Sequence, residues 1–159
     1  MKRLKILQNL ERKCVSLAVF IGLTMIPFTS YAQHKTETME TKTIFTTLIK
    51  KHFEILNTKD SKDRIGLMEK TYNSDFRIIE SNFENSGITE FNNAIEQFHQ
   101  KMPGKKFIMA EDTVFLNSAA KALWTLGNSV TGEDVFLFRD GKISTIVVFV
   151  KPVQEIKSK

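Results

Sequence analysis

Residues Glu133 to Val150 read EDVFLFRDGKISTIVVFV, and this stretch decides the fold. Two runs rich in β-branched and aromatic residues, Glu133–Phe138 and Ile143–Val150, flank the turn Arg139-Asp140-Gly141. Asp-Gly between two such runs is the favoured signal for a two-residue hairpin turn. The runs at 106–116 and 120–126 precede this hairpin and extend it to a four-strand antiparallel meander.

Upstream of the meander the apolar residues change from alternating to helical spacing. From Thr43 to Leu56 they recur at i, i+3 and i+4, which predicts an amphipathic helix ending at Asn57-Thr58. A second helix follows a cap at Asp60 or Ser61, and a third helix has Thr89 as its cap. The remaining elements are a strand over 75–80 and the body of the third helix over 88–101. The chain is therefore predicted as α+β, with three helices on a curved, mostly antiparallel sheet around an apolar pocket.

The first thirty-two residues predict a cleaved secretory signal peptide. A basic start precedes an apolar run of about 15 residues, too short for the ~20 of a membrane-spanning helix. Small residues, Ser30 and Ala32, stand at the cleavage positions. A periplasmic or secreted protein that meets the membrane only during export is expected, with an uncleaved membrane anchor as the alternative. The predicted boundaries are 1–32 for the signal, 33–42 for a flexible leader, 43–152 for the domain and 153–159 for a polar tail.

Removal of the signal changes what the charge implies. The whole chain of 159 residues carries a net charge of +5. Residues 1–32 hold five of the basic residues and one acid, so 18 basic and 17 acidic residues remain after cleavage. A nearly neutral domain without a basic, aromatic-rich patch does not predict nucleic-acid binding. The single Cys, Cys14, excludes an intramolecular disulfide framework and a Cys-rich zinc site.

Three polar residues stand on apolar faces and are the candidate catalytic residues. Strand alternation places Glu80 on the face of Phe76 and Ile78, and it places Asp134 on the face of Phe136 and Phe138. His52 lies within the apolar stripe of the first helix. An ionised carboxylate among hydrophobes is costly, and such groups suit acid–base chemistry near neutral pH. The alternatives are a solvated rim carboxylate for Asp134, a strand-end position without a fixed face for Glu80, and a half-buried imidazole bonded to the backbone for His52.

The same faces supply the predicted ligand contacts. Trp124 and Tyr72 are each interpreted either as pocket residues or as ordinary core and rim residues, and the wider ligand-binding set is Tyr72, Trp124, Phe76, Ile78, Phe136 and Phe138. The chain has no phosphate-binding glycine-rich loop and no His-x-x-x-His pair. No metal site and no cofactor are therefore expected.

Several stretches together carry a resemblance to a known superfamily. They include 52–57 (HFEILN), 72–80 (YNSDFRIIE), 124–127 (WTLG) and 132–143 (GEDVFLFRDGKI). Over roughly residues 44–150 the chain resembles the nuclear transport factor 2-like, or SnoaL-like, superfamily, which includes ketosteroid isomerase. The resemblance implies a cone-shaped α+β barrel and a homodimer formed through the sheet.

The resemblance also implies roles for individual residues. The general-base Asp of ketosteroid isomerase falls on Glu80, its oxyanion-binding Asp on Asp134 and its oxyanion-binding Tyr on His52. A longer acid and a missing phenol depart from that pattern, so steroid isomerisation itself is not expected. The expected function is cofactor-free proton transfer on a small carbonyl compound, of isomerase, cyclase or lyase type. A non-catalytic ligand-binding or dimeric interaction module of the same fold is the alternative.

Overall fold

The computed structural model describes residues 29–110, 113–128 and 130–152. Two compact units divide the chain, Met1–His34 and Lys35–Lys159, and only the start of one helix is described in the first unit. All that follows concerns the second unit. The polar tail and residues 1–28 of the predicted signal peptide lie outside the described residues. Among the described helices, none is long and apolar enough to cross a membrane.

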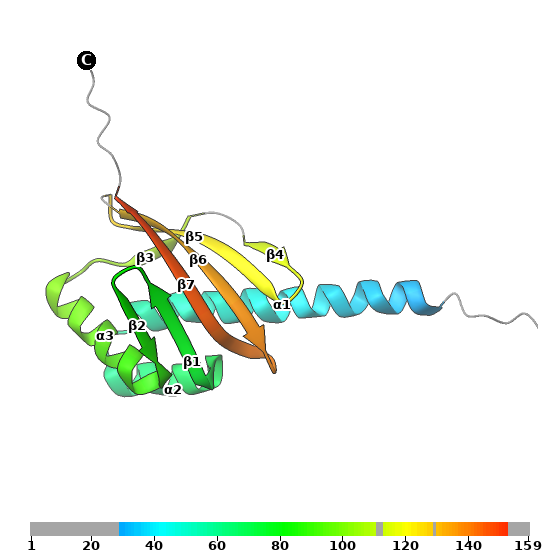
Figure 1. Cartoon of the computed structure of the whole chain (residues 1–159), viewed down its shortest axis with the longest axis horizontal. Helices are drawn as coiled ribbons and strands as arrows, with labels where there is room; N and C mark the ends of the chain where they lie inside the picture. The colour runs from blue at the N-terminus through cyan, green and yellow to red at the C-terminus, as the bar shows by residue number, and fades with distance from the viewer. Residues whose placement is uncertain (1–28, 111–112, 129, 153–159) are drawn as a thin grey trace, which may run out of the picture. The chain divides into compact units, whose positions relative to one another are not determined.

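Three helices and seven strands make up the described fold (Figure 1). In chain order they are α1 (Thr29–Asn57), α2 (Ser61–Thr71), β1 (Tyr72–Glu80), β2 (Phe83–Ser86), α3 (Gly87–Lys101), β3 (Phe107–Met109), β4 (Val114–Leu116), β5 (Ala119–Leu126), β6 (Val130–Arg139) and β7 (Lys142–Pro152).

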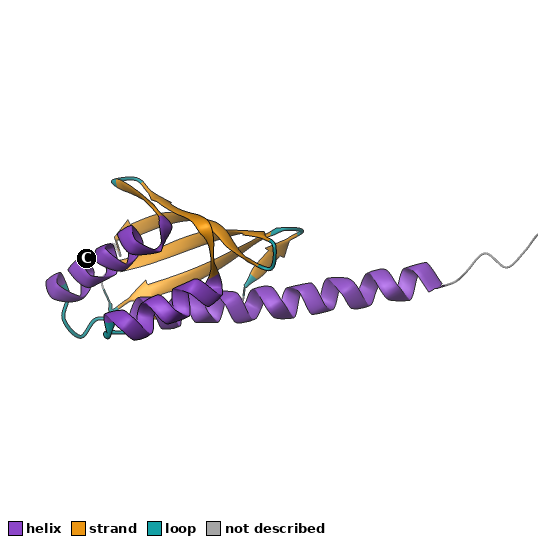
Figure 2. Cartoon of the chain, turned by 90° about the horizontal axis from the view of Figure 1, so that it is seen from below, coloured by secondary structure: helices purple, strands orange, loops and turns teal. Residues whose placement is uncertain are grey.

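One mixed sheet holds all seven strands. Its order is β2-β1-β7-β6-β5-β3, and β4 pairs with β5 beyond β3. The pairing of β1 with β7 is parallel and the others are antiparallel. The predicted α+β class is confirmed, but the sheet does not close into a barrel. Helices lie along one face of the curved sheet (Figure 2). Buried apolar residues of helices and strands form one core cluster.

The hairpin that decided the fold forms as predicted. β6 and β7 pair from Val130↔Pro152 to Arg139↔Lys142. The turn has positive φ at Asp140 (53°) and Gly141 (70°), as the favoured two-residue hairpin turn requires. The register shifts once, between Leu137 and Phe138. Asp134, Phe136 and Phe138 all lie on the buried face of β6.

Several elements differ from the prediction. Residues 83–86, where no strand was predicted, form β2 because they pair with β1 from Arg77↔Ser86 to Glu80↔Phe83. The predicted strand over 106–116 is broken into β3 and β4. Residues 33–42, predicted as a flexible leader, belong to helix α1. Just after this stretch, the side-chain hydroxyls of Thr43 and Thr46 donate to the carbonyls four residues earlier, those of Met39 and Lys42. Threonines within a helix commonly make such bonds.

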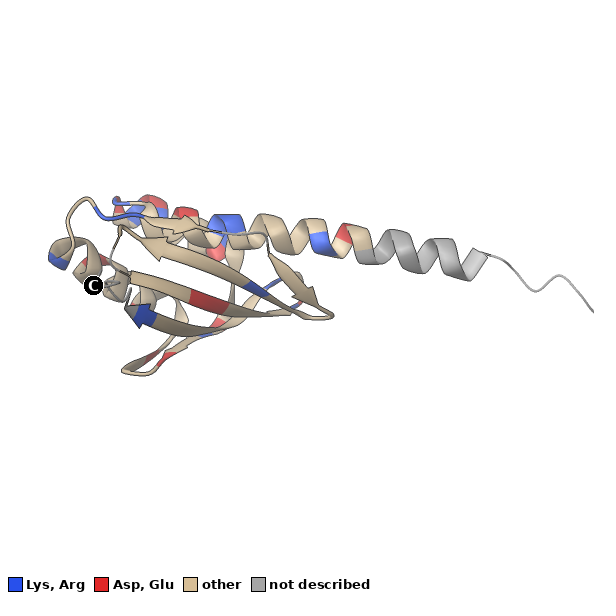
Figure 3. Ribbon diagram, turned by 90° about the horizontal axis from the view of Figure 1, so that it is seen from above, with Lys and Arg blue, Asp and Glu red and all other residues tan. Residues whose placement is uncertain are grey.

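The core lies between the buried stripe of α1 and the concave face of the sheet. Its sheet side includes alternate residues of β5 and β6, among them Ala120, Ala122 and Trp124, and further residues of β1 and β7. Most of the sheet ribbon is uncharged, with scattered charged positions along its strands (Figure 3). His52 and Asp134 are buried polar residues of the core, and they need an explanation.

Candidate functional site

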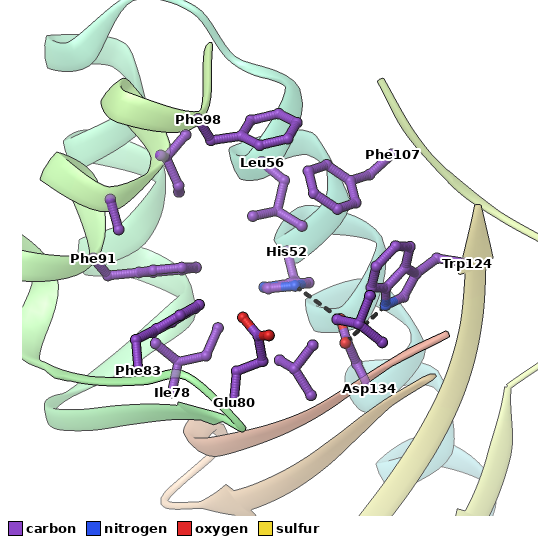
Figure 4. Close-up of a pocket in the computed structure, with 14 residues that line it drawn as sticks. His52, Leu56, Ile78, Glu80, Phe83, Phe91, Phe98, Phe107, Trp124 and Asp134 are labelled. Carbon is purple, nitrogen blue, oxygen red and sulfur yellow. Dashed lines mark hydrogen bonds and ion pairs between the residues drawn. The ribbon is translucent and has the colours of Figure 1, made fainter. Parts of the chain in front are cut away.

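A pocket of about 200 Å³ opens between the concave face of the sheet and helices α1 and α3 (Figure 4). This is smaller than the roughly 300–1,000 Å³ of pockets for drug-sized ligands, so it suits a smaller molecule. Its lining is mainly aromatic and aliphatic: His52, Leu56, Ile78, Glu80, Phe83, Phe91, Ala94, Ile95, Phe98, Phe107, Trp124, Asp134, Val148 and Val150. Among the described residues that line it, none is Lys or Arg.

The structure brings the three candidate catalytic residues together in this pocket. His52 comes from α1, Glu80 from the end of β1 and Asp134 from β6. Glu80 is half-buried, and its carboxylate points into the pocket toward His52 (Figure 4). Asp134 is 2% exposed and His52 1%, so neither is a solvated rim residue. One accessible carboxylate thus faces a buried imidazole across an apolar space.

His52 and Asp134 belong to a chain of buried polar contacts. The hydroxyl of Tyr72 lies 2.9 Å from Nδ1 of His52. Nε2 of His52 lies 3.3 Å from Oδ2 of Asp134, and the indole Nε1 of Trp124 donates to Oδ1 of Asp134 at 2.8 Å. The His52–Asp134 contact has ion-pair distance without hydrogen-bond direction. Nε2 therefore has no hydrogen-bond partner among the described residues, although it is buried.

The chemistry of these groups indicates which of them donate and which accept. Burial, and then the charge of Asp134, raises the pKa of Tyr72 well above its ordinary value, so its phenol stays neutral and can donate. An indole can only donate, so Trp124 needs Asp134 as its acceptor. Oδ1 of Asp134 thus accepts from Trp124, and Oδ2 lies 3.3 Å from Nε2 of His52 without hydrogen-bond direction. The resemblance implied a different role for Asp134, as a protonated donor to a substrate oxygen, and that role stays a prediction.

The other predicted ligand contacts divide into two groups. Ile78 and Trp124 line the pocket. Tyr72, Phe76, Phe136 and Phe138 lie outside the lining, in the core around His52 and beyond it. Tyr72 stacks on Phe76 with ring centroids 4.2 Å apart, and Phe136 meets His52 edge-on at 5.2 Å. Phe138 stacks on Phe45 at 3.8 Å. Strand alternation placed Phe76, Phe136 and Phe138 on the buried face, as observed. There they pack against other aromatic rings rather than line the pocket.

Several pocket residues were missed by the sequence prediction. Phe91 and Phe98 are seven residues apart in the predicted third helix, a spacing that places them on one face, so a signal for them existed. Phe83 lies where no strand or helix was predicted. Phe107 is held at the pocket by Asn57, whose side-chain amide donates to its carbonyl at 2.8 Å and accepts from its N–H at 2.9 Å. This two-bond contact joins residues 50 positions apart, and no local pattern indicates it.

Gly132 gives Trp124 its place. The two residues are direct partners across β5 and β6, and a Cβ built on Gly132 would lie 2.1 Å from the indole ring. Only glycine lets the ring lie against β6 at this point and reach Asp134 two residues along that strand. The described residues contain no group of three or more His, Cys, Asp or Glu side chains that could hold a metal ion.

Comparison with known proteins places the fold. No protein-family profile matches the sequence, and no curated protein does. Among solved structures, a candidate isomerase of the SnoaL-like family from Agrobacterium tumefaciens is similar, with a TM-score of 0.65, 22% identity and coverage of 69% of this chain and 98% of that one. A candidate SnoaL-like polyketide cyclase from Jannaschia has a TM-score of 0.55, 14% identity and coverage of 67% and 86%. A candidate ketosteroid isomerase from Kribbella flavida has a TM-score of 0.52, 18% identity and coverage of 71% and 82%.

These identities establish the fold alone. The predicted nuclear transport factor 2-like, SnoaL-like architecture is confirmed. The structures that share it include candidate isomerases and a candidate cyclase. Because one fold hosts many activities, the argument for function depends on the pocket.

Proposed function

We propose, from the SnoaL-like fold as premise, that this protein catalyses cofactor-free proton transfer on a small uncharged carbonyl compound. The observation that carries the proposal is the buried Nε2 of His52, which has no hydrogen-bond partner among the described residues and stands across an apolar pocket from Glu80. A buried polar atom without a partner is costly. A ligand that offers an oxygen to Nε2 would remove that cost.

The reaction assigns one task to each residue. Glu80 removes a proton from the carbon next to the carbonyl, and the electron pair moves onto the carbonyl oxygen. The N–H of His52 at Nε2 donates to that oxygen as negative charge develops on it. Glu80 then returns the proton to another carbon, which completes an isomerisation without a further reactant. Asp134 touches no reacting atom in this scheme, and it orients His52.

Two features of the pocket support this assignment. The apolar lining strengthens hydrogen bonds formed inside it and keeps water from competing with them. Glu80 is half-buried and extends from a strand end, so its carboxylate can approach a carbon acid. Nε2 itself has almost no exposed area, so the ligand must displace neighbouring side chains slightly. Hydrogen bonds of catalytic groups commonly tighten only when the substrate binds.

Glu80→Gln tests the proposal. The assay follows deuterium uptake from D2O at the carbons beside the carbonyl in a panel of small uncharged ketones and 1,3-dicarbonyl compounds, by proton NMR. We expect the variant to lose about 10²- to 10⁴-fold in exchange rate, the usual contribution of a general base. Binding is measured separately by the fluorescence of Trp124, the only Trp in the chain, which lines the pocket.

The matched control is Glu133→Gln. Glu133 precedes Asp134 on β6, but it lies on the other face of the sheet and pairs with Lys121 at 3.2 Å. The Glu133→Gln variant should keep both the deuterium exchange rate and the ligand affinity of the unaltered protein. The enzymatic proposal fails if the unaltered protein binds these compounds, changes the fluorescence of Trp124 and never exceeds the rate in buffer. That result would favour the ligand-binding module.

We further propose that the protein is exported and works as a homodimer. Export rests on the signal-like sequence of residues 1–32, and N-terminal sequencing of the exported protein should begin at Gln33. The partner in the dimer is a second copy that covers the outer face of the sheet. That face exposes apolar side chains, among them Ile108, Leu137 and Phe149 (60%, 41% and 52% exposed).

A further inference from the structure

Tyr72 makes the one hydrogen bond that the described residues offer to Nδ1 of His52. We infer that Tyr72 is a positioning residue that keeps His52 neutral in the tautomer with its proton on Nε2, on the pocket side of the ring. The role of this tautomer in catalysis rests on the proposed function, whereas the tautomer itself is inferred from the contacts of His52 alone.

The surroundings of Tyr72 give its hydroxyl one available hydrogen-bond acceptor among the described residues. Its side chain is 1% exposed, and its ring is packed against Phe76 and Phe91 at 4.2 and 5.9 Å. Phenylalanine rings offer no ordinary acceptor, and the hydroxyl lies 2.9 Å from Nδ1 of His52. A buried phenol donates to an available acceptor, so Nδ1 must supply a lone pair. A neutral imidazole that accepts at Nδ1 carries its proton at Nε2.

The packing around His52 prevents the ring from reversing this assignment by rotation. Its ring lies parallel to Phe91, with centroids 6.4 Å apart and planes 6° apart. Phe53 and Phe136 meet its edges at 5.3 and 5.2 Å. A ring held on three sides keeps Nδ1 toward Tyr72 and Nε2 toward Asp134. The titratable groups that face it, namely Tyr72, Asp134 and, across the pocket, Glu80, then act on fixed nitrogens.

Asp134 agrees with this proton position. Its Oδ2 lies 3.3 Å from Nε2, so the carboxylate favours a proton on that nitrogen electrostatically. The geometry is not that of a hydrogen bond, so the N–H is still able to donate to a ligand. Tyr72 and Asp134 therefore favour the same tautomer from opposite sides of the ring. The outcome is a neutral hydrogen-bond donor suited to a developing oxyanion.

The test is imidazole ¹⁵N–¹H NMR of the full chain near pH 7.5, which distinguishes the two neutral tautomers and the cation by nitrogen shift. The chain has three histidines, and a His99→Asn variant helps to assign their signals. In the unaltered protein His52 should have a bare Nδ1 and a protonated Nε2. In Tyr72→Phe the bare Nδ1 loses its donor, so the fraction protonated at Nδ1 should rise several-fold.

His99 is the internal control in the Tyr72→Phe spectrum. Its Nε2 lies 2.8 Å from the carbonyl of Leu56 and so must carry a proton, and its signals should not move. For proton exchange we expect kcat to fall at least about tenfold with KM changed less than threefold, because the substrate still fits. A residue with a purely structural role would leave the His52 tautomer unchanged in every folded variant.

The inference is overturned if His52 of the unaltered protein carries its proton on Nδ1, or on both nitrogens, at this pH. That measurement needs no variant, so it decides the matter even if Tyr72→Phe folds poorly. Failure of the proposed function looks different. In that case His52 shows the Nε2–H tautomer while no carbonyl compound exchanges faster than in buffer.

Discussion

Two buried polar side chains of this protein, Arg64 and His52, are almost equally hidden from solvent but differ in how fully they are paired. Arg64 is 0% exposed, and each of its guanidinium nitrogens has a partner. Nε donates to Asn92 Oδ1 at 2.7 Å and Nη2 to Glu96 Oε2 at 2.8 Å. Nη1 donates to two carbonyls, those of Thr58 and Lys59. His52 is 1% exposed, and one of its two nitrogens has no hydrogen-bond partner in the described part of the chain.

The difference separates a structural group from a functional one. A buried charge with every donor satisfied holds its neighbours in place, and here Arg64 joins the end of α1 and the loop after it to α2 and α3. A buried polar atom left without a partner costs free energy, and proteins retain such atoms mainly where a ligand will use them. Position matters as well. The buried Oδ1 of Asn73 also lacks a partner among the described residues, but Asn73 does not line the pocket.

The strongest test of this comparison is Arg64→Met. Removing the guanidinium leaves two carbonyls and the side chains of Asn92 and Glu96 without their donor, and breaking a buried pair in this way typically costs about 3–5 kcal/mol. Because Glu96 is half exposed and can turn to water, we expect a value near the lower end. Urea unfolding followed by circular dichroism measures the loss.

Proton exchange per folded molecule should be unchanged in Arg64→Met, because Arg64 does not line the pocket. A variant that kept its stability and lost its exchange activity would reverse the comparison. It would show that the satisfied cluster, not the incomplete one, serves the chemistry.

Gly132→Ala acts on the His52 side of the comparison and should have a smaller effect. The new Cβ would meet the Trp124 ring at 2.1 Å, so the indole must move away from β6. Crowding a packed core typically costs about 1–3 kcal/mol, and the bond from Trp124 to Asp134 breaks with it. Fluorescence of Trp124 should shift to longer wavelength as the ring becomes more exposed.

Gly66→Ala is the matched control for Gly132→Ala. Nothing lies within 4 Å of a Cβ placed at Gly66 in α2, so alanine should stabilise the helix by up to about 1 kcal/mol. If Gly132→Ala kept both the stability and the emission spectrum of the unaltered protein, Gly132 would not be what fixes Trp124 beside Asp134.

Sequence reasoning found the parts of the site that depend on local periodicity. Strand alternation placed Asp134 on the buried face of β6, and helical spacing placed His52 in the stripe of α1. Both periods repeat over a few residues, so they are visible without the fold. The hairpin turn at Asp140-Gly141 was equally visible, because its residues are chosen by backbone conformation.

The contacts between elements could not be predicted. Tyr72 and His52 are 20 residues apart, on β1 and α1, and meet only in the folded protein. Arg64 stands among polar residues of α2, and its burial depends on Asn92 and Glu96 of α3. β2 becomes a strand through pairing with β1 rather than through its own composition. The open sheet was also missed, since closure depends on how strands curve over many residues.

The smallest expected effect is a difference in how stability depends on pH between the surroundings of His52 and those of Arg64. Burial, and secondarily the charge of Asp134, raises the pKa of Tyr72 well above the ordinary tyrosine value of about 10. Below pH 10 the phenol is neutral in both the folded and the unfolded chain, and its contribution to stability is fully present. As pH rises further, Tyr72 ionises first in the unfolded chain, and this ionisation stabilises the unfolded state. The free energy of unfolding should then fall by about 1.4 kcal/mol per pH unit until the higher pKa of the folded state is reached. The urea midpoint of the unaltered protein and of Tyr72→Phe, followed from pH 8 to 11, measures this loss as the difference between two curves that share all lysine titrations.

The curve of Arg64→Met should stay parallel to that of the unaltered protein, because a guanidinium does not titrate in this range. Parallel curves for the unaltered protein and Tyr72→Phe would mean that the phenol ionises as easily inside the fold as outside it, and Tyr72 could then not serve as a fixed donor to His52.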